Sequence, residues 1–133
     1  MEVSSQRVTG SRSWARTLYL VLASLIFLGI FLQGFFIGSL LFAGMSWGAR
    51  AHSMTGMLLL LLALLLMIAG FIARLPRNMH ILNVVFLVLM LIQMMLPSLK
   101  GSVPLVSALH PANALLLIGL NTYLILRATK KQS

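Results

Sequence analysis

The chain has 133 residues, of which 60% are hydrophobic and 8% charged, and its formal net charge is +9. An average soluble domain carries roughly a quarter charged residues, so this composition indicates an integral membrane protein. The absence of cysteine excludes disulfides, iron–sulfur clusters, thiolate zinc sites and cysteine nucleophiles. Glu2 is the only acidic residue, so no carboxylate is available inside the membrane for a proton relay. No nucleophile–base–acid set or phosphate-binding glycine loop is present, which argues against a hydrolase or an ATP-driven machine.

Four long apolar segments follow one another along the chain, at residues 18–44, 51–73, 79–96 and 105–126. A transmembrane helix needs about 20 apolar residues, and each segment reaches or approaches that length. Their connections are short, so neighbouring helices must be antiparallel. We therefore predict an all-α fold, an integral membrane antiparallel four-helix bundle over residues 18–127. Basic tails at 1–17 and 128–133 flank it.

The basic residues are unevenly distributed over the two sides of this bundle. Eight lie on the side of the chain ends, namely Arg7, Arg12, Arg16, Arg74, Arg77, Arg127, Lys130 and Lys131, and two lie on the other side, Arg50 and Lys100. The positive-inside rule then predicts cytoplasmic N- and C-termini. We interpret the positive charge as orienting the chain against anionic lipid head groups, and not as a nucleic-acid surface.

Several residues mark where the predicted helices begin or break. Ser46 is suited to cap the second helix, and Pro104 to begin the fourth. Pro111 removes a helical hydrogen bond, so it predicts a kink or a restart of the fourth helix. In the first helix, Gly34-Phe-Phe-Ile-Gly38 is a small-xxx-small pattern. It predicts close packing with another helix, or room for a planar cofactor or a partner subunit.

Two histidines stand at matching places in the second and fourth segments. Each is followed four positions later by a small residue and then by leucines, in His52-Ser-Met-Thr-Gly56-Met-Leu-Leu-Leu and in His110-Pro-Ala-Asn-Ala114-Leu-Leu-Leu-Ile. An imidazole beside hydrocarbon is costly to keep, so two of them in matched places indicate a site.

Glutamines extend the match upstream. Gln33 precedes His52 by 19 residues, and Gln93 precedes His110 by 17. The chain is therefore typical of a two-helix hairpin present twice, with one polar pair in each copy. Side-chain amides in lipid often join helices by hydrogen bonds, so both glutamines either tie helices together or line a haem or quinone pocket. Asn113 has the same interpretation and could also hydrogen-bond near His110.

The two histidines favour a haem hypothesis. In an up-down bundle the second and fourth helices face each other diagonally, so two inward imidazoles at similar depth would take both axial positions on an iron. Gly56 and Ala114, one turn below them, would leave space for the porphyrin. Arg50 and Lys100, on the same side of the membrane, would neutralise its propionates. The alternative is that both histidines lie at the membrane interface, hydrogen-bonded to water or carbonyls.

Other side chains carry weaker hypotheses. Thioethers bind Cu(I), and four methionines lie toward the same end as the histidines, Met45, Met54, Met94 and Met95. Methionine is also a usual filler of apolar helices, so we expect packing there. His80 has no matched partner and is assigned to the membrane interface. Tyr19 and Tyr123 lie near the cytoplasmic boundary and fit an aromatic belt.

Gln33, His52 with Gly56, Gln93 and the run His110-Pro-Ala-Asn-Ala-Leu115 together resemble a family of small bacterial four-helix membrane proteins with no assigned function. This likeness covers about residues 31–126. The chain more loosely resembles one half of the haem A synthase fold, in which histidines on a four-helix bundle hold haem. That likeness implies haem binding at His52 and His110. It does not imply haem A synthesis, because a second bundle and the carboxylate usual in that active site are missing.

We therefore expect a multi-pass protein of the bacterial plasma membrane that binds one b-type haem between the second and fourth helices for electron transfer. The competing hypothesis is a cofactor-free accessory or assembly subunit of a membrane complex. A third is a small carrier of a metal or an apolar solute. Expected partners are the lipid bilayer and either another membrane subunit or a quinone, and no nucleic acid.

Overall fold

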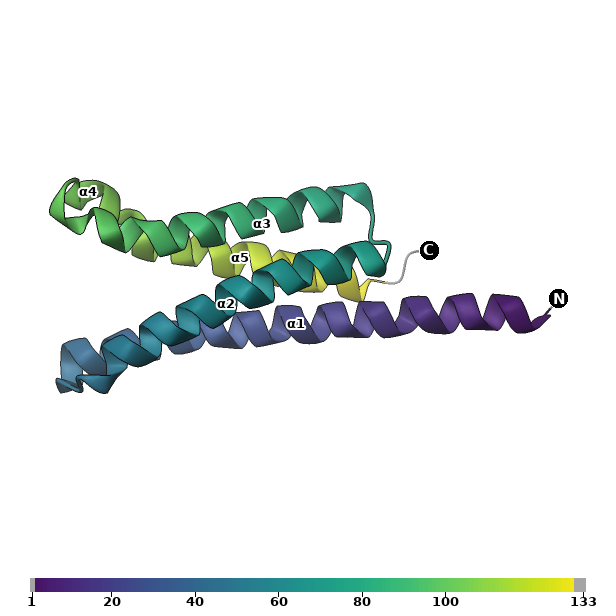
Figure 1. Ribbon diagram of the computed structural model, residues 1–133, viewed down its shortest axis with the longest axis horizontal. Coiled ribbons are helices and arrows are strands. Elements are labelled where there is room, and N and C mark those ends of the chain that lie inside the picture. The colour runs from purple at the N-terminus through teal and green to yellow at the C-terminus, as the bar shows by residue number, and fades with distance from the viewer. Residues whose placement is uncertain (1, 131–133) are drawn as a thin grey trace.

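The computed structural model describes residues 2–130, with side chains from residue 14 onward. Its elements are α1 (Glu2–Ala43), α2 (Trp47–Ile72), α3 (Arg77–Met95), the 3-10 helix η1 (Leu96–Gly101), α4 (Pro104–Ser107) and α5 (Leu109–Thr129) (Figure 1). No strand occurs in this range, so the predicted all-α fold is confirmed. Lys131 and the side chains of Arg7 and Arg12, counted above among the orienting charges, lie outside the described part.

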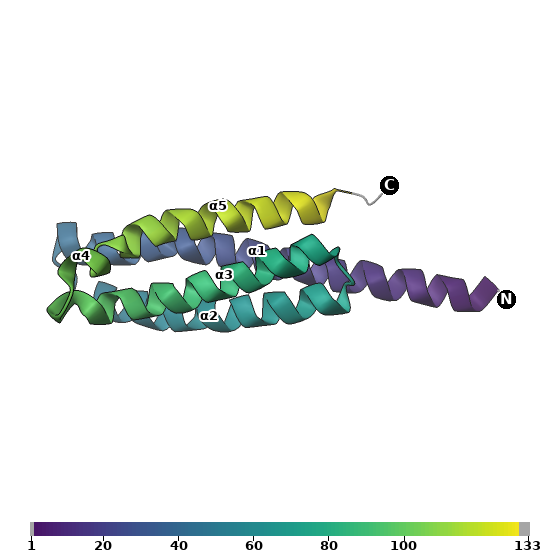
Figure 2. The same ribbon diagram turned by 90° about the horizontal axis from the view of Figure 1, so that it is seen from above.

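Four helical stretches of the described chain are long and apolar enough to cross a membrane, at Trp14–Ala43, Trp47–Ile72, Arg77–Gly101 and Pro104–Thr129. They form two hairpins, which we call hairpin 1 (α1 and α2) and hairpin 2 (α3 to α5). Each of α1 and α3 packs against both α2 and α5, whereas α2 and α5 lie diagonally (Figures 1 and 2). Both chain ends lie at one end of the bundle, the terminal end; the α1–α2 turn and α4 lie at the other, the turn end.

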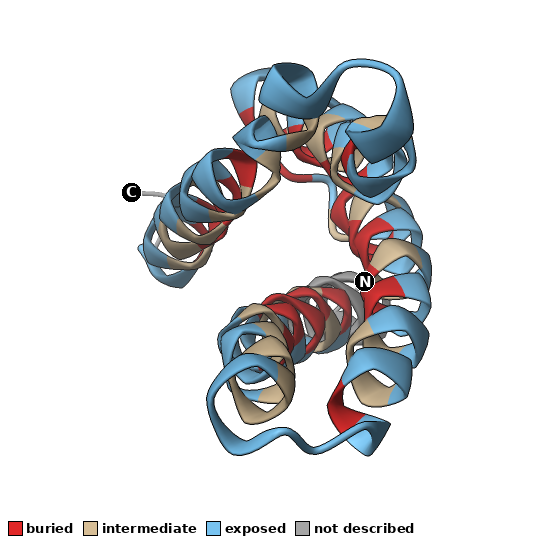
Figure 3. Cartoon of the chain, turned by 90° about the vertical axis from the view of Figure 1, so that its left-hand side faces the viewer, coloured by how far each residue is buried: buried red, intermediate tan, exposed pale blue. Residues whose placement is uncertain are grey.

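Burial repeats from one hairpin to the other. The buried positions Leu59, Ala63, Leu66 and Gly70 of α2 correspond, 58 residues further on, to the buried positions Leu117, Asn121, Leu124 and Ala128 of α5. Likewise Tyr19, Ala23 and Ile26 of α1 correspond, 60 residues further on, to Met79, Asn83 and Phe86 of α3. These faces turn inward in the end-on view (Figure 3). The three-dimensional structure therefore carries the same hairpin repeat that the histidine and glutamine pairs indicate.

The packed core occupies the terminal end and the middle of the bundle. Toward the turn end the two hairpins diverge (Figure 1). Among the described residues, α1 has no buried position after Gly29, and α5 has none before Asn113. The core layers therefore stop just below the two histidines.

Buried polar contacts tie hairpin 2 to α1. The Tyr19 hydroxyl donates to Asn83 Oδ1 at 2.8 Å, and Asn121 Nδ2 donates to the carbonyl of Ala23 at 2.9 Å. Tyr19 is fully buried, so its prediction as a member of an aromatic belt is wrong. The hydroxyl finds its hydrogen bond in the core instead of at a wet interface. Tyr123, in contrast, is exposed, with the Arg127 guanidinium 5.9 Å from its ring centre.

At the terminal end, Arg16 closes the bundle. Its guanidinium donates to the carbonyl of Ala128 at 2.7 Å and to that of Lys130. Ala128 is in the last turn of α5 and Lys130 is the residue that follows the helix, and carbonyls at such a helix end have no partner within the helix. A cation is also favourable at a helix C-terminus.

The helix boundaries differ in detail from those predicted. α1 already begins at Glu2, so the segment predicted as a tail is helical, and α2 begins at Trp47, directly after Ser46. Ser46 occupies the N-cap position of α2 but makes no side-chain cap hydrogen bond. Pro104 does begin a helix, the short α4. As Pro111 predicted, the fourth span restarts: α5 begins at Leu109, which puts this proline in the first turn, where its missing N–H is tolerated.

Close helix approach occurs at a different glycine from the one predicted. A Cβ added at Gly34 would have nothing within 4 Å, and one at Gly38 would meet only Phe42 of its own helix. The small-xxx-small pattern of α1 is therefore not used for packing within the described chain. Instead a Cβ at Gly48 would overlap the carbonyl oxygen of Phe36 and the hydroxyl of Ser39, because α1 and α2 meet there near their turn.

We expect Gly48→Ala to lower the free energy of unfolding by about 1–3 kcal/mol, since the added methyl meets backbone that cannot yield. Gly34→Ala is the matched control, and it should not destabilise because its methyl enters open space. Thermal unfolding in detergent, followed by circular dichroism, measures both. Equal stability of the two variants would contradict the close approach at Gly48.

Candidate functional site

His52 of α2 and His110 of α5 meet across the diagonal of the bundle. Their ring centres are 6.0 Å apart and their planes are inclined by 58°. Both side chains are half-buried. Equivalent positions of the two hairpins therefore approach each other at the level where the hairpins begin to diverge.

Each imidazole is fixed by the glutamine of its own hairpin. His52 Nδ1 lies 3.2 Å from the carbonyl oxygen of Gln33, and His110 Nδ1 lies 3.0 Å from that of Gln93. A carbonyl only accepts, so each Nδ1 carries the proton and donates it. In a ring with a single proton, the lone pair is then on Nε2. Metal-binding histidines are commonly oriented in this way, with the other ring nitrogen donating to a carbonyl.

In hairpin 2 a hydrogen-bonded chain continues from the ring. Gln93 Nε2 lies 3.3 Å from His110 Nε2 and donates to it. Asn113 Nδ2 donates to Gln93 Oε1 at 2.8 Å and to the carbonyl of Leu89 at 3.0 Å. Gln93 thus contacts both nitrogens of one imidazole, through its backbone and through its side chain.

Hairpin 1 lacks this chain. Thr55 stands at the position that corresponds to Asn113, and its hydroxyl has no hydrogen bond to a described residue. Gln33 Oε1 is buried without a hydrogen-bond partner among the described residues, and His52 Nε2 has none either. The two acceptors leave hairpin 1 with hydrogen-bonding capacity that the described chain does not satisfy.

The space beside Gly56, one of the two small residues that follow the histidines, is already filled. A Cβ at Gly56 would lie 3.1 Å from Gln33 Nε2 and 3.5 Å from Met94 Sδ, so these two side-chain ends fill the space beside it. Ala114 is half-buried. Arg50, in the first turn of α2, and Lys100, in η1, are exposed at the turn end, the same end as the histidines.

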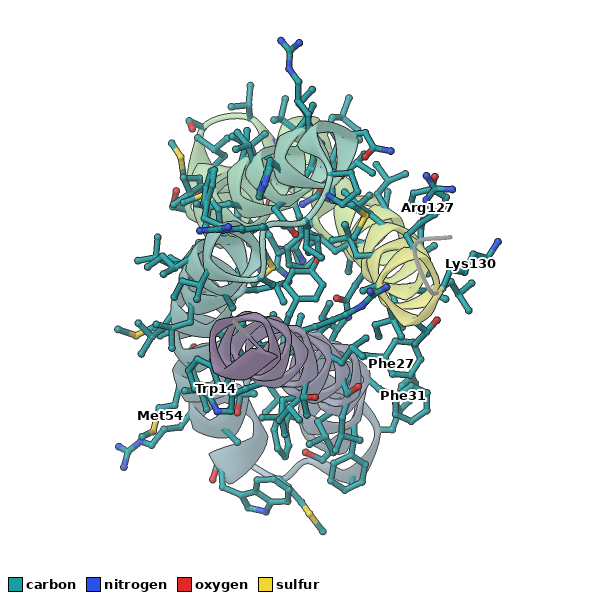
Figure 4. All side chains as sticks on the ribbon, turned by 90° about the vertical axis from the view of Figure 1, so that its right-hand side faces the viewer. Trp14, Phe27, Phe31, Met54, Arg127 and Lys130 are labelled. Carbon is teal, nitrogen blue, oxygen red and sulfur yellow. The ribbon has the colours of Figure 1, made fainter. Side chains whose placement is uncertain are left out.

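The methionines do not gather around the histidines. Met54 projects from α2 on the outer side of the molecule (Figure 4), and Met45, Met54 and Met95 are all exposed. Met94 is the one that contacts the site, through Gly56. Within the described range no group of three or more His, Cys, Asp or Glu side chains could hold a metal ion. The metal-ligating side chains that come close to each other here are the two imidazoles.

The third histidine, His80, lies away from this pair. His80, near the start of α3, stacks on Phe71 of α2 with ring centres 4.3 Å apart and planes inclined by 7°. It thus packs at the α2–α3 turn, at the terminal end of the bundle. The sequence analysis did not single out Asn83, which is the buried hydrogen-bond partner of Tyr19. An amide inside an otherwise apolar helix was the signal that could have indicated it.

Comparison with known protein families, with curated proteins and with solved structures finds no match for this chain. The resemblances stated from the sequence therefore stay predictions. Fold alone would not assign an activity in any case, so a function has to follow from the site itself.

We expect Asn113→Leu to destabilise the protein by about 1 kcal/mol, because two interhelical hydrogen bonds of roughly 0.6 kcal/mol each are lost. Thr55→Val is the matched control in hairpin 1 and should change stability by less than about 0.5 kcal/mol, since no hydrogen bond is removed. Unfolding in mixed micelles measures both. An effect of the same size in the two variants would show that the amide chain contributes nothing.

Proposed function

We propose that the protein binds one b-type haem between His52 and His110 and serves electron transfer in the bacterial plasma membrane. The observation that carries the proposal is the separation of the two rings. Two axial metal–nitrogen bonds of about 2 Å each, extended by the half-width of each imidazole, separate ring centres by about 6 Å. The ring centres of His52 and His110 are 6.0 Å apart.

The donor set also favours haem over a bare ion. A four-coordinate metal would need two further protein ligands, and the described residues offer no third His, Cys, Asp or Glu beside the pair. A porphyrin brings four nitrogens of its own, so two imidazoles complete the coordination. When bound, the haem supplies a one-electron redox centre. The chain's part is to hold both rings through the carbonyls of Gln33 and Gln93 and to exclude water.

The surroundings are compatible with a large flat ligand. The side chains that fill the space beside Gly56 are the flexible ends of Gln33 and Met94, which can move at small cost. Phe27 and Phe31 project from α1 on the side nearest α5 (Figure 4), and Phe31 is 69% exposed. They would offer an apolar wall to such a ligand.

Charge supports the orientation that we propose. Arg50 and Lys100 lie at the turn end and would neutralise the propionates. The positive-inside rule assigns this end to the extracytoplasmic side. The electron donor would then be a quinone or a second membrane subunit reaching the outer half of the bilayer.

A second candidate is a cofactor-free accessory or assembly subunit. It is favoured by the way in which His110, Gln93 and Asn113 satisfy one another without any ligand. In that case the polar chain would serve helix packing. This candidate would be supported if the purified protein were colourless and formed a stable complex with another membrane protein.

We expect protein purified from haem-replete cells to be red, with the Soret band and the low-spin electron paramagnetic resonance signal of a bis-histidine haem. The low-spin signal should be lost in His52→Ala and in His110→Ala, and the double variant should bind no haem. His80→Ala is the control and should keep the signal, because His80 lies at the other end of the bundle. Colourless wild-type protein would reject the haem proposal.

A further inference from the structure

The two histidines differ in what each would have to release in order to bind a metal. His52 Nε2 has no hydrogen-bond partner among the described residues, so it would coordinate without breaking any bond. His110 Nε2 accepts from the Gln93 amide, at 3.3 Å. That hydrogen bond must be given up before the same lone pair can be offered to iron.

The Gln93 amide is itself held in place. Its oxygen accepts from Asn113 Nδ2 at 2.8 Å, and Asn113 also donates to the carbonyl of Leu89. The amide nitrogen is thereby kept directed at His110. Among the described residues of hairpin 1 there is no such support, because Thr55 stands in place of the asparagine and Gln33 Oε1 has no hydrogen-bond partner. The asymmetry therefore arises from a few side chains and not from the backbone repeat.

We propose that His52 is the permanent ligand of the haem and His110 the exchangeable one, with Gln93 acting as a latch that competes for His110 Nε2. This inference rests on the proposed haem site. The coordination position on the side of His110 would then open to a small neutral ligand such as carbon monoxide. In that exchange the iron would lose its bond to His110 Nε2 and gain one to carbon monoxide, and His110 Nε2 would regain the hydrogen bond from the Gln93 amide. No electron or proton is transferred.

The consequence is a further activity. The latch would make His110 easier to displace than His52, so a diatomic gas would bind on the side of His110. A hydrogen bond between neutral groups changes such an equilibrium by up to about tenfold. Gln93 is a positioning residue in this scheme, since it acts through His110.

The test measures the affinity of the dithionite-reduced haem protein for carbon monoxide, from the shift of the Soret band. Gln93→Leu removes the competitor of His110, so the affinity for carbon monoxide should fall about three- to tenfold. Asn113→Leu, which only releases the latch, should act in the same direction with a smaller effect. Gln33→Leu removes no hydrogen bond from a histidine, because His52 contacts the backbone carbonyl of Gln33. The fold-change in carbon monoxide affinity should therefore be at least three times smaller than that of Gln93→Leu. Thr55→Val, outside the site, is the control for unchanged affinity.

Single histidine variants give an independent readout. His110→Ala should retain haem with a five-coordinate, high-spin spectrum, and added imidazole should restore the low-spin spectrum. His52→Ala should lose haem or hold it at least about tenfold more weakly. Equal haem retention in both variants, together with an unchanged carbon monoxide affinity in Gln93→Leu, would overturn the latch and leave the haem proposal standing. Colourless wild-type protein would overturn both.

Discussion

Buried polar groups of this bundle lie in surroundings that offer little water, and the hydrogen bonds that most of these groups form organise the rest of the structure. Backbone groups form these bonds within helices. The few polar side chains form them by reaching across to another helix, as Asn121 does to the carbonyl of Ala23 and Tyr19 does to Asn83. Arg16 does the same at the terminal end, where it caps the carbonyls of α5. Polar contacts therefore join neighbouring helices and, through Tyr19 and Asn83, also the diagonal pair α1 and α3, while the apolar core fills the space between them.

The repeat gives the bundle its symmetry, and polar residues present in hairpin 2 only remove part of that symmetry. The core positions of the two hairpins correspond, but Asn83, Asn113 and Asn121 of hairpin 2 stand where hairpin 1 has Ala23, Thr55 and Ala63. Asn113 consequently gives hairpin 2 a hydrogen-bonded chain beside its histidine, whereas Gln33 Oε1 of hairpin 1 is buried without a partner among the described residues. The proposed haem site at the junction of such halves would have two similar ligands with different surroundings. It would combine a stable ligand with an exchangeable one.

Several expectations failed for the same physical reason. A sequence shows that Tyr19 is aromatic and lies near a helix end, but not whether that face turns to lipid or to Asn83. The Gly34 and Gly38 pair has the spacing of a packing motif, yet the neighbouring helix approaches Gly48 instead. Helix rotation about its own axis decides these cases, and in a chain that is apolar on all sides the pattern of residues carries little information about rotation.

Length, hydropathy and the positions of the prolines and basic residues were enough to predict four antiparallel membrane-spanning helices, because each of these properties acts locally or through a short connection. The spacing of Gln33, His52, Gln93 and His110 was enough to suggest a repeated hairpin with a polar pair in each copy. Only the tertiary structure decided that the two rings meet at 6.0 Å and that Gln93 bonds both nitrogens of its histidine while Gln33 bonds one. Those facts depend on how two hairpins pack and on a single amide rotamer, and neither is a property of any one segment.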